Sequence, residues 1–347
     1  MIPDDPVQGK RLHVNVGFSC NNNCIFCMEE DRLERYDRLS NQTVEDVRRM
    51  LEASTNAEMV MFTSGEPTLN PDLIEHIKTA KKLGFREIGM ISNGRRLGYA
   101  KYTYTLLNAG LNHVLVSLHG PNARIHDALT RTRGSFDQTF KGIKVLSAMK
   151  QVFPDLKLHT SFVVTKRNMA YFREFYDLVS PLVDQMVFNM MMPDGRGATY
   201  FDRLMPRYSE VVQHFESFLN KIPAKEQERV FLLDIPNCVT EGLPDASRGY
   251  VERYFHFEPE TAPGISGVLD AGDTLVQADA LNGEGTKYAR VEKSLRDSQV
   301  RAKREQCRNC IHNTYCQGVF TIYLKHYGWD EFKPVKKVRD SGQQGKK

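Results

Sequence analysis

The sequence of 347 residues lacks any long apolar run. Its apolar segments, such as Phe162-Val163-Val164, are far shorter than the roughly 20 residues of a membrane-spanning helix. Residues 1–6 contain no basic stretch followed by an apolar one, so they do not have the pattern of a secretory signal. We therefore expect a cytoplasmic protein that does not contact a membrane.

Cysteine is also scarce, with seven residues in the chain. In a reducing compartment, cysteines are more often metal ligands or catalytic groups than partners in disulfides. The net charge is only +4, and the basic tail at 331–347 supplies much of it. Short basic tails are common and unspecific, so we expect a disordered tail and no nucleic-acid partner.

Three of the cysteines lie close together after the first strand pattern. The apolar segment at 12–18 runs into an asparagine-rich loop with Cys20, Cys24 and Cys27, spaced C-x3-C-x2-C. This spacing predicts thiolate ligands at the end of a strand. Three thiolates are one fewer than the four that fill a zinc or ordinary iron–sulfur site, so one metal position would stay open for chemistry.

With the aromatic Phe26 before its last cysteine, this loop resembles the signature of the radical S-adenosylmethionine (radical SAM) enzymes. The resemblance implies that Cys20, Cys24 and Cys27 bind three irons of a [4Fe–4S] cluster and that SAM chelates the fourth. A zinc loop, or three cysteines with unrelated roles, is the alternative. The strand-to-loop context that the motif needs is present, which favours the cluster.

Strand and helix patterns alternate six times along the chain. After the first strand, the others are expected at 58–63, 87–92, 113–118, 158–164 and 184–192. Such alternation implies an α/β fold with a parallel sheet and right-handed crossovers. Polar clusters follow these strands, and the active site of a (β/α) barrel lies at the carboxyl ends of its strands. The family resemblance implies a partial (β/α)6 TIM-type barrel, which we assign to 1–215.

The loop after the second strand carries a further motif. Ser64-Gly65-Glu66-Pro67 resembles the glycine–glycine–glutamate motif of the family, with Ser64 in place of the first glycine. The resemblance implies that Gly65 and Glu66 bind the amino group of SAM. Glycine suits this task because nothing blocks the approach of its backbone to a ligand. An ordinary strand-to-helix turn is the alternative.

Other polar residues follow the third and fourth strands. By position, Asn93, Ser117 and His119 resemble the family's contacts to the ribose and carboxylate of SAM. Arg131 and Arg133 follow soon after and suit a carboxylate partner. Side chains that only satisfy loop backbone are the alternative.

The sequence does not mark a general base. Three residues are candidates by position alone: His119, Asp194 and Tyr208.

A second cysteine group lies near the C-terminus. Cys307, Cys310 and Cys316 have the spacing C-x2-C-x5-C, and Cys238 ends a strand pattern at 231–235. Together they supply four thiolates, which a closed iron–sulfur or structural zinc site requires. With the first three, this grouping uses all seven cysteines. A free buried Cys238 is the alternative, and His312 is then the fallback ligand.

This region, assigned to 216–330, resembles the SPASM and twitch extensions of radical SAM enzymes, which carry auxiliary [4Fe–4S] clusters. A full SPASM extension would have a further cysteine where this chain has Phe320. The resemblance therefore implies one auxiliary cluster and favours the smaller α+β twitch type. Zinc at the four thiolates is the alternative.

The resemblance implies a function in which a reduced cluster cleaves SAM to a 5′-deoxyadenosyl radical, which abstracts a hydrogen atom from the substrate. An electron donor such as a flavodoxin or ferredoxin is then expected. Our leading hypothesis is an oxidoreductase or transferase that oxidises or cross-links a ribosomally made peptide. The second is a dehydrogenase or rearrangement enzyme for a small metabolite, such as a sugar alcohol or nucleoside. The third is a non-catalytic zinc-binding module.

Overall fold

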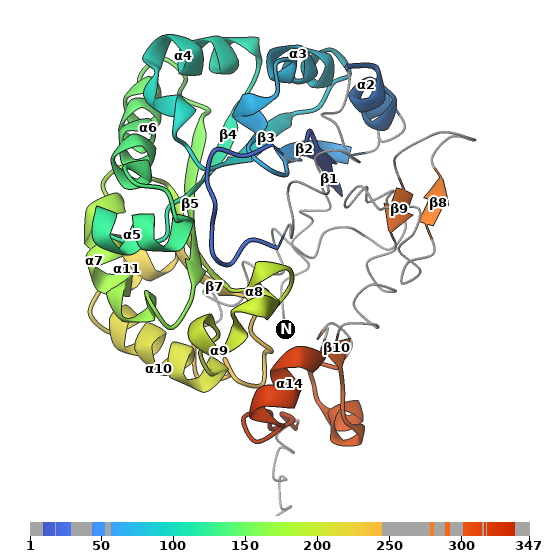
Figure 1. Ribbon diagram of the computed structural model, residues 1–347, viewed down its shortest axis with the longest axis vertical. Helices are drawn as coiled ribbons and strands as arrows, with labels where there is room; N and C mark the ends of the chain where they lie inside the picture. The colour runs from blue at the N-terminus through green and yellow to red at the C-terminus, as the bar shows by residue number, and fades with distance from the viewer. Residues whose placement is uncertain are drawn as a thin grey trace, which may run out of the picture.

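Seven parallel strands form one sheet in the computed structural model, and they lie side by side in sequence order (Figure 1). The strands are β1 (Lys10–Asn15), β2 (Ala57–Thr63), β3 (Glu87–Ser92), β4 (His113–Ser117), β5 (Lys157–Val164), β6 (Gln185–Met190) and β7 (Val230–Leu233). The structure describes residues 10–17, 19–28, 44–52, 57–244, 278–280, 289–291, 301–313, 316 and 318–336.

Helices cover the outer side of the curved sheet (Figure 1). They are α2 (Val44–Glu52), α3 (Leu73–Lys82), α4 (Ala100–Ala109), α5 (Ala123–Thr130), α6 (Ser135–Met149), α7 (Phe172–Val179), α10 (Tyr208–Leu219) and α11 (Ala224–Gln227). The short helices α8 (Arg196–Thr199) and α9 (Phe201–Leu204) follow the carboxyl end of β6. Single 3-10 turns are η1 (Pro67–Leu69), η2 (Arg96–Gly98) and η3 (Met169–Tyr171). None of the described helices has the length and apolar composition needed to cross a bilayer.

The predicted partial barrel is confirmed, with one strand more than expected. The segment Val230–Leu233 pairs in parallel with β6, so it extends the barrel sheet instead of opening a second domain. Its four residues are all buried and apolar. Four helices, α8 to α11, separate it from β6, and this long interval interrupts the alternation of strand and helix patterns in the sequence. Among the described residues β1 and β7 do not pair, so the barrel stays open.

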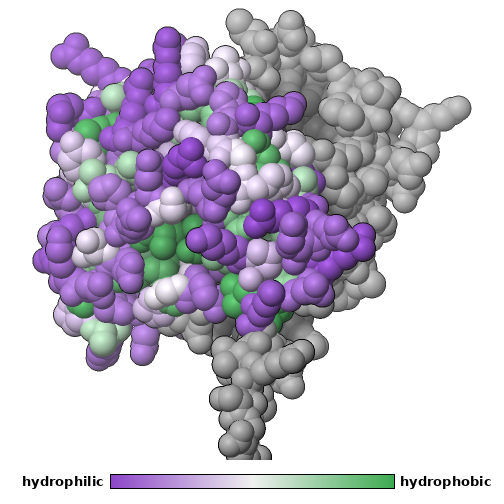
Figure 2. Space-filling view, turned by 90° about the horizontal axis from the view of Figure 1, so that it is seen from below, coloured by the Kyte–Doolittle hydropathy of each residue, from purple (hydrophilic) through white to green (hydrophobic). Residues whose placement is uncertain are grey.

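The outer face of the sheet supplies the apolar core. Alternate strand residues such as Val14, Phe62 and Val116 are fully buried against the helices. Around β5 and β6 the core is aromatic: the ring of Phe188 lies 4.9 Å from Phe172 and 5.2 Å from Phe162. Burial of each such ring contributes about 1.5–3 kcal/mol, so this layer is the main source of stability. The described surface in Figure 2 is mainly hydrophilic, with only small apolar patches.

The inner face is more polar. Ser117 on β4 is paired in register with Ser161 on β5. Asn189, on β6, donates a hydrogen bond from Nδ2 to Ser161 Oγ at 2.7 Å. Because side chains alternate between the two faces of a strand, these residues point away from the helices and into the barrel.

Nearer the amino ends of the strands, the inner face carries a buried hydrogen-bonded chain. His113 Nδ1 lies 2.5 Å from Glu87 Oε1, and His113 Nε2 lies 3.1 Å from His159 Nδ1. Both histidines are only 2% exposed. Glu87 also pairs with Lys157, and both line an open cavity of about 590 Å³ at this end of the barrel.

Electrostatics favour the ionised form of Glu87. Burial alone would raise the pKa of this carboxyl, but its hydrogen bonds and charge interactions with His113 and Lys157 outweigh burial and lower the pKa to about 2. An unfolded glutamate has a pKa near 4.3. The ionised carboxylate therefore stabilises the fold above about pH 4.3, and this contribution is lost as the pH falls towards 2.

The small C-terminal part packs on α9 and α10. It contains β10 (Arg301–Ala302), the 3-10 turn η4 (Glu305–Asn309), β11 (Val319–Phe320) and α14 (Thr321–Tyr327), and β10 pairs with β11 antiparallel. The hydroxyl of Tyr323, on α14, accepts a hydrogen bond from the backbone of Tyr208 at 2.9 Å. Tyr327 donates to the carbonyl of Met205 at 2.7 Å. Two short strands, β8 (Ala278–Ala280) and β9 (Ala289–Val291), pair antiparallel.

The prediction of a disordered tail from residue 331 was wrong for its first six residues, 331–336. Phe332 is 2% exposed, and Glu331 accepts hydrogen bonds from Ser209 and Tyr323. The carbonyl of Val335 accepts a hydrogen bond from the amide of Ile311 at 2.9 Å. The charged composition of 331–336 suggested a solvated tail, although a few of its residues make apolar contacts and hydrogen bonds. Residues 337–347 lie outside the described part.

We predict that Glu87→Gln lowers the free energy of unfolding at pH 7 by on the order of 1–3 kcal/mol, because it removes the charge that pairs with His113 and Lys157. The difference from wild type should shrink as the pH falls below about 4.3. Anaerobic urea unfolding at several pH values measures both effects. The matched control is Glu75→Gln on α3, whose exposed pair with Lys78 is worth little. A difference that persists unchanged at pH 3 would contradict the assignment.

Candidate active site

The cysteine loop at 19–28 is fixed by backbone hydrogen bonds to three segments that follow other strands. Ser19 O accepts from the amide of Glu66 at 2.8 Å, after β2. The amides of Asn23 and Ile25 donate to the carbonyls at the end of α5, after β4. Cys27 O accepts from the amide of Arg196 at 3.0 Å, after β6. The loop therefore lies where the carboxyl ends of the strands converge, as the sequence predicts.

The three thiols of this loop are half-buried, and none of the seven cysteines, all of which are described, forms a disulfide. The amide of Asn22 points to Cys20 Sγ at 3.4 Å. Asn93 Nδ2 lies 3.9 Å from the same sulfur and donates to Asn21 Oδ1 at 2.6 Å. Donors next to a sulfur stabilise a thiolate, so this environment fits thiolate ligands of a cluster.

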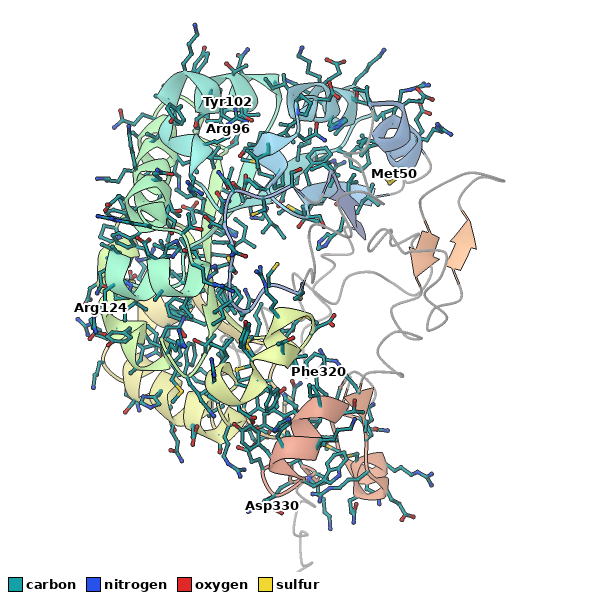
Figure 3. All side chains as sticks on the ribbon, viewed as in Figure 1. Met50, Arg96, Tyr102, Arg124, Phe320 and Asp330 are labelled. Atoms are coloured by element: carbon teal, nitrogen blue, oxygen red, sulfur yellow. The ribbon has the colours of Figure 1, made fainter. Side chains whose placement is uncertain are left out.

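The Ser64–Pro67 loop has a strained backbone. Ser64 and Gly65 both have positive φ, of 72° and 52°. Such a conformation costs a non-glycine residue about 1–3 kcal/mol, and it recurs at functional sites. This geometry explains why a glycine, as in the resembled motif, is the natural residue at position 64. Next to this loop, Arg96 lies over the ring of Tyr102 at 4.7 Å, and both donate to Thr68 O (Figure 3).

Glu66 is the buried centre of this region, with only 2% of the residue exposed. Its Oε1 accepts hydrogen bonds from Ser92 Oγ at 2.7 Å and from both the hydroxyl and the amide of Thr68. Its Oε2 accepts from the amide of Asn93 at 2.6 Å. Burial raises the pKa of Glu66 despite these bonds. The carboxyl group thus ties the loop after β2 to the loop after β3, and its direct contact with SAM stays a prediction.

His119 is a packed residue at the end of β4. Its Nδ1 accepts from the amide of Val163 at 3.1 Å, and its ring lies edge-on to Phe26 at 4.9 Å. Burial, and then the neighbouring His126, hold the pKa of His119 well below its usual value. A neutral ring whose acceptor nitrogen is occupied is poorly placed to take a proton. The geometry therefore favours a role in supporting Phe26.

The other predicted residues lie in different settings. Ser117 is half-buried on the inner face, and Arg131 is exposed at the end of α5 with a left-handed φ of 51°. Asp194 is exposed and accepts from the amide of Gly195 at 2.8 Å. Tyr208 is fully buried and stacks on Tyr323. Tyr208 is therefore part of the packing between α10 and α14.

Comparisons with known proteins agree with this geometry. A model of the "Radical SAM superfamily" matches residues 14–179. A "Probable GTP 3',8-cyclase" of Saccharolobus islandicus (strain Y.N.15.51 / Yellowstone #2) is 32% identical over 222 residues, which cover 63% of this chain and 67% of that protein. The chain belongs to the radical SAM superfamily. An "AdoMet-dependent heme synthase" of Oleidesulfovibrio alaskensis (strain ATCC BAA-1058 / DSM 17464 / G20) is 29% identical over 205 residues, which cover 58% of this chain and 50% of that protein.

A solved structure is similar in fold. The radical S-adenosylmethionine methyltransferase TsrM from Kitasatospora setae matches with a TM-score of 0.50 and 10% identity, over 72% of this chain and 60% of that one. At this identity the match shows the fold alone.

Membership of the radical SAM superfamily assigns a [4Fe–4S] cluster and SAM to the site. The residues present fit them, since three half-buried thiols share one loop with nearby N–H donors. Within the described residues, no three His, Cys, Asp or Glu side chains group closely enough for a single metal ion. The thiolates that bind a cluster lie farther apart than the ligands of a single ion, because each thiolate binds a different iron.

The structure also brings the second cysteine group together. Burial raises the pKa of the Cys238 thiol to about 12, with further contributions from the nearby Cys316, Cys310 and Cys307. The amide of Val335 donates to Cys310 Sγ at 3.3 Å, and that of Gly318 to Cys316 Sγ at 3.4 Å. His312 is paired with Glu241 at 2.9 Å. These four thiols are therefore neighbours, with N–H donors beside two of them, which fits the wider arrangement of a cluster.

Sequence reasoning missed the turn between β6 and α8. Gly195 has a φ of 51°, and a Cβ there would lie 2.3 Å from the carbonyl oxygen of Met28. A Cβ on Gly197 would lie 2.5 Å from the carbonyl oxygen of Met192. The turn is therefore moulded against the end of the cysteine loop, and only glycine fits at these positions. The signal for this turn in the sequence was the pair Gly195 and Gly197 on either side of Arg196.

We predict that Glu66→Gln lowers the free energy of unfolding of the SAM-free protein by about 1–3 kcal/mol, because an amide nitrogen would face the donors of Asn93 or Ser92. Thermal unfolding without SAM measures this. The exposed Glu58→Gln on β2 is the control. If Glu66 served only to bind SAM, its variant would unfold like wild type in the absence of SAM.

Proposed function

We propose that this radical SAM enzyme abstracts a hydrogen atom from a small polar metabolite, with nucleosides and nucleotides as the first candidates. The observation that carries the proposal is the polar inner face near the carboxyl ends of the strands, where Ser117 lies in register with Ser161 and Asn189 bonds to Ser161. The relatives named GTP 3',8-cyclase and heme synthase point the same way. They favour the small metabolite over the ribosomally made peptide.

Polar groups inside a barrel need hydrogen-bond partners. Asn189 and Ser161 bond to each other. Ser117 is half-buried, and its hydroxyl has no hydrogen bond to the residues that the structure describes. Sugar hydroxyls and base nitrogens would supply the missing partners. A substrate of this kind would be oriented by the inner face of the barrel, with its target C–H bond turned toward the cysteine loop.

When bound, the reduced cluster and SAM supply a 5′-deoxyadenosyl radical. The chain's own residues hold the site around it. The loop of Cys20, Cys24 and Cys27 is anchored to three segments that follow other strands, which limits movement of the cluster. Phe26 and His119 pack edge to face and help to exclude water from the mouth. Exclusion of water protects a reactive radical from side reactions.

We also assign an auxiliary [4Fe–4S] cluster to Cys238, Cys307, Cys310 and Cys316, in a twitch-like extension. It would carry an electron to or from the substrate or brace the C-terminal part. A flavodoxin or ferredoxin in the cytoplasm would reduce the first cluster. The net reaction is then an oxidation or a rearrangement, depending on whether that electron leaves the substrate.

The anaerobically reconstituted protein should hold about eight irons per chain, in two clusters. It should cleave SAM to 5′-deoxyadenosine when a strong reductant is added. Replacing Cys20, Cys24 and Cys27 together by alanine should leave about four irons and abolish cleavage. Replacing the four auxiliary cysteines is the matched control, since it should remove the other irons and leave SAM cleavage detectable. Zinc without iron would reject the enzyme in favour of a binding module.

A substrate panel separates the two kinds of substrate. Nucleosides and nucleotides should raise the rate of 5′-deoxyadenosine formation over the basal rate, because a bound substrate couples cleavage to hydrogen abstraction. Peptides should not do so. A peptide that loses two mass units in the same assay would overturn the choice of a small metabolite.

A further inference from the structure

Arg196 is the first residue of α8, the short helix that follows β6 and lies beside the cysteine loop (Figure 1). Its amide donates to Cys27 O at 3.0 Å, and its Nη1 donates to Asn23 Oδ1. The residue as a whole is half-buried. Its other two nitrogens, Nε and Nη2, are buried and have no hydrogen-bond partner in the described structure.

These two nitrogens form the side edge of the guanidinium group. The Nε–H and one Nη2–H point in parallel, which is the geometry that matches the two oxygens of a carboxylate or phosphate. A buried charged donor without a partner is costly, so its retention calls for a ligand. The nearest acidic side chain in sequence, Asp194, is exposed and accepts from the amide of Gly195 instead.

The position of the edge is set by the backbone. Gly195 and Gly197 have no room for a Cβ against the carbonyl oxygens of Met28 and Met192. The turn is thus packed directly against the end of the cysteine loop, and the hydrogen bond from the amide of Arg196 to Cys27 O ties it there. Because Nη1 is already engaged by Asn23, the guanidinium group is fixed at both ends and presents only its Nε–Nη2 edge.

We propose that this edge of Arg196 binds an oxyanion of the substrate, a phosphate or carboxylate group, at the rim of the barrel. The inference rests on the proposed function, since it makes the small polar substrate an anionic one. The carboxylate of SAM is the other source of the same chemistry. Arg131 and Arg133, both exposed after α5, are already its predicted partners.

The test compares Arg196→Gln and Arg196→Lys with wild type in the reconstituted protein. Arg203→Gln, exposed on α9, is the matched control. Four probes are used in equilibrium binding under anaerobic conditions: GTP, guanosine, SAM and decarboxylated SAM. Arg196→Gln should weaken GTP binding by about 10- to 100-fold and leave guanosine binding unchanged, because only GTP carries the oxyanion. Arg196→Lys should restore part of the loss, since it keeps the charge but not the paired donors.

Other results would overturn the inference. They are equal loss for GTP and guanosine, no loss for either, or a loss confined to SAM but absent for decarboxylated SAM. A purely structural role is tested by thermal unfolding without ligand. There Arg196→Gln should melt close to wild type, whereas a large drop with unchanged binding of all probes would also overturn it.

The proposed function fails separately. If wild type binds GTP through Arg196 but forms no 5′-deoxyadenosine with SAM and reductant, the oxyanion site stands and the radical reaction is rejected. If wild type forms 5′-deoxyadenosine but binds GTP no better than guanosine, the oxyanion site is rejected and the enzyme stands.

Discussion

The active site depends on how the cysteine loop is held in one place. No disulfide fixes it. Backbone hydrogen bonds to Glu66, Arg196 and the end of α5 hold it instead, and each of these lies in the segment after a different strand. Each net hydrogen bond is worth only about 0.5–1.5 kcal/mol, but together they define one position for three thiols. Glu66 extends this frame to the loop after β3 by accepting from Asn93.

The sheet allows this arrangement because its outer face packs against the helices and its inner face carries polar groups. Apolar residues on the outer face, such as Phe62 and Phe188, bind the helices and supply stability. The inner face is thereby released from core packing, and it carries polar groups such as Asn189 at the mouth and the Glu87–His113 pair near the amino ends. The barrel sheet is also not closed between β1 and β7 in the described chain.

Much of the fold and the cluster loop could be predicted from the sequence. The strand patterns and the spacing of Cys20, Cys24 and Cys27 are local, so they can be recognised in the sequence alone. The role of Glu66 could not be seen, because its partners Ser92 and Asn93 lie on another loop. The packing of Tyr208 could not be predicted for the same reason, because its stacking on Tyr323 joins segments far apart in the chain. The turn between β6 and α8 contacts the cysteine loop through backbone atoms. Such contacts do not depend on side-chain identity, so the two glycines were their only signal in the sequence.

The central claim is that the cysteine loop directs a radical at a small polar molecule held by the inner face. Deuterium transfer tests it most directly. A nucleotide or nucleoside that stimulates SAM cleavage is deuterated at its ribose carbons and incubated with enzyme, SAM and reductant, and 5′-deoxyadenosine is analysed by mass spectrometry. The account predicts deuterium in the 5′-methyl group of 5′-deoxyadenosine. Unlabelled 5′-deoxyadenosine from every such substrate, together with deuterium transfer from a labelled peptide, would contradict it.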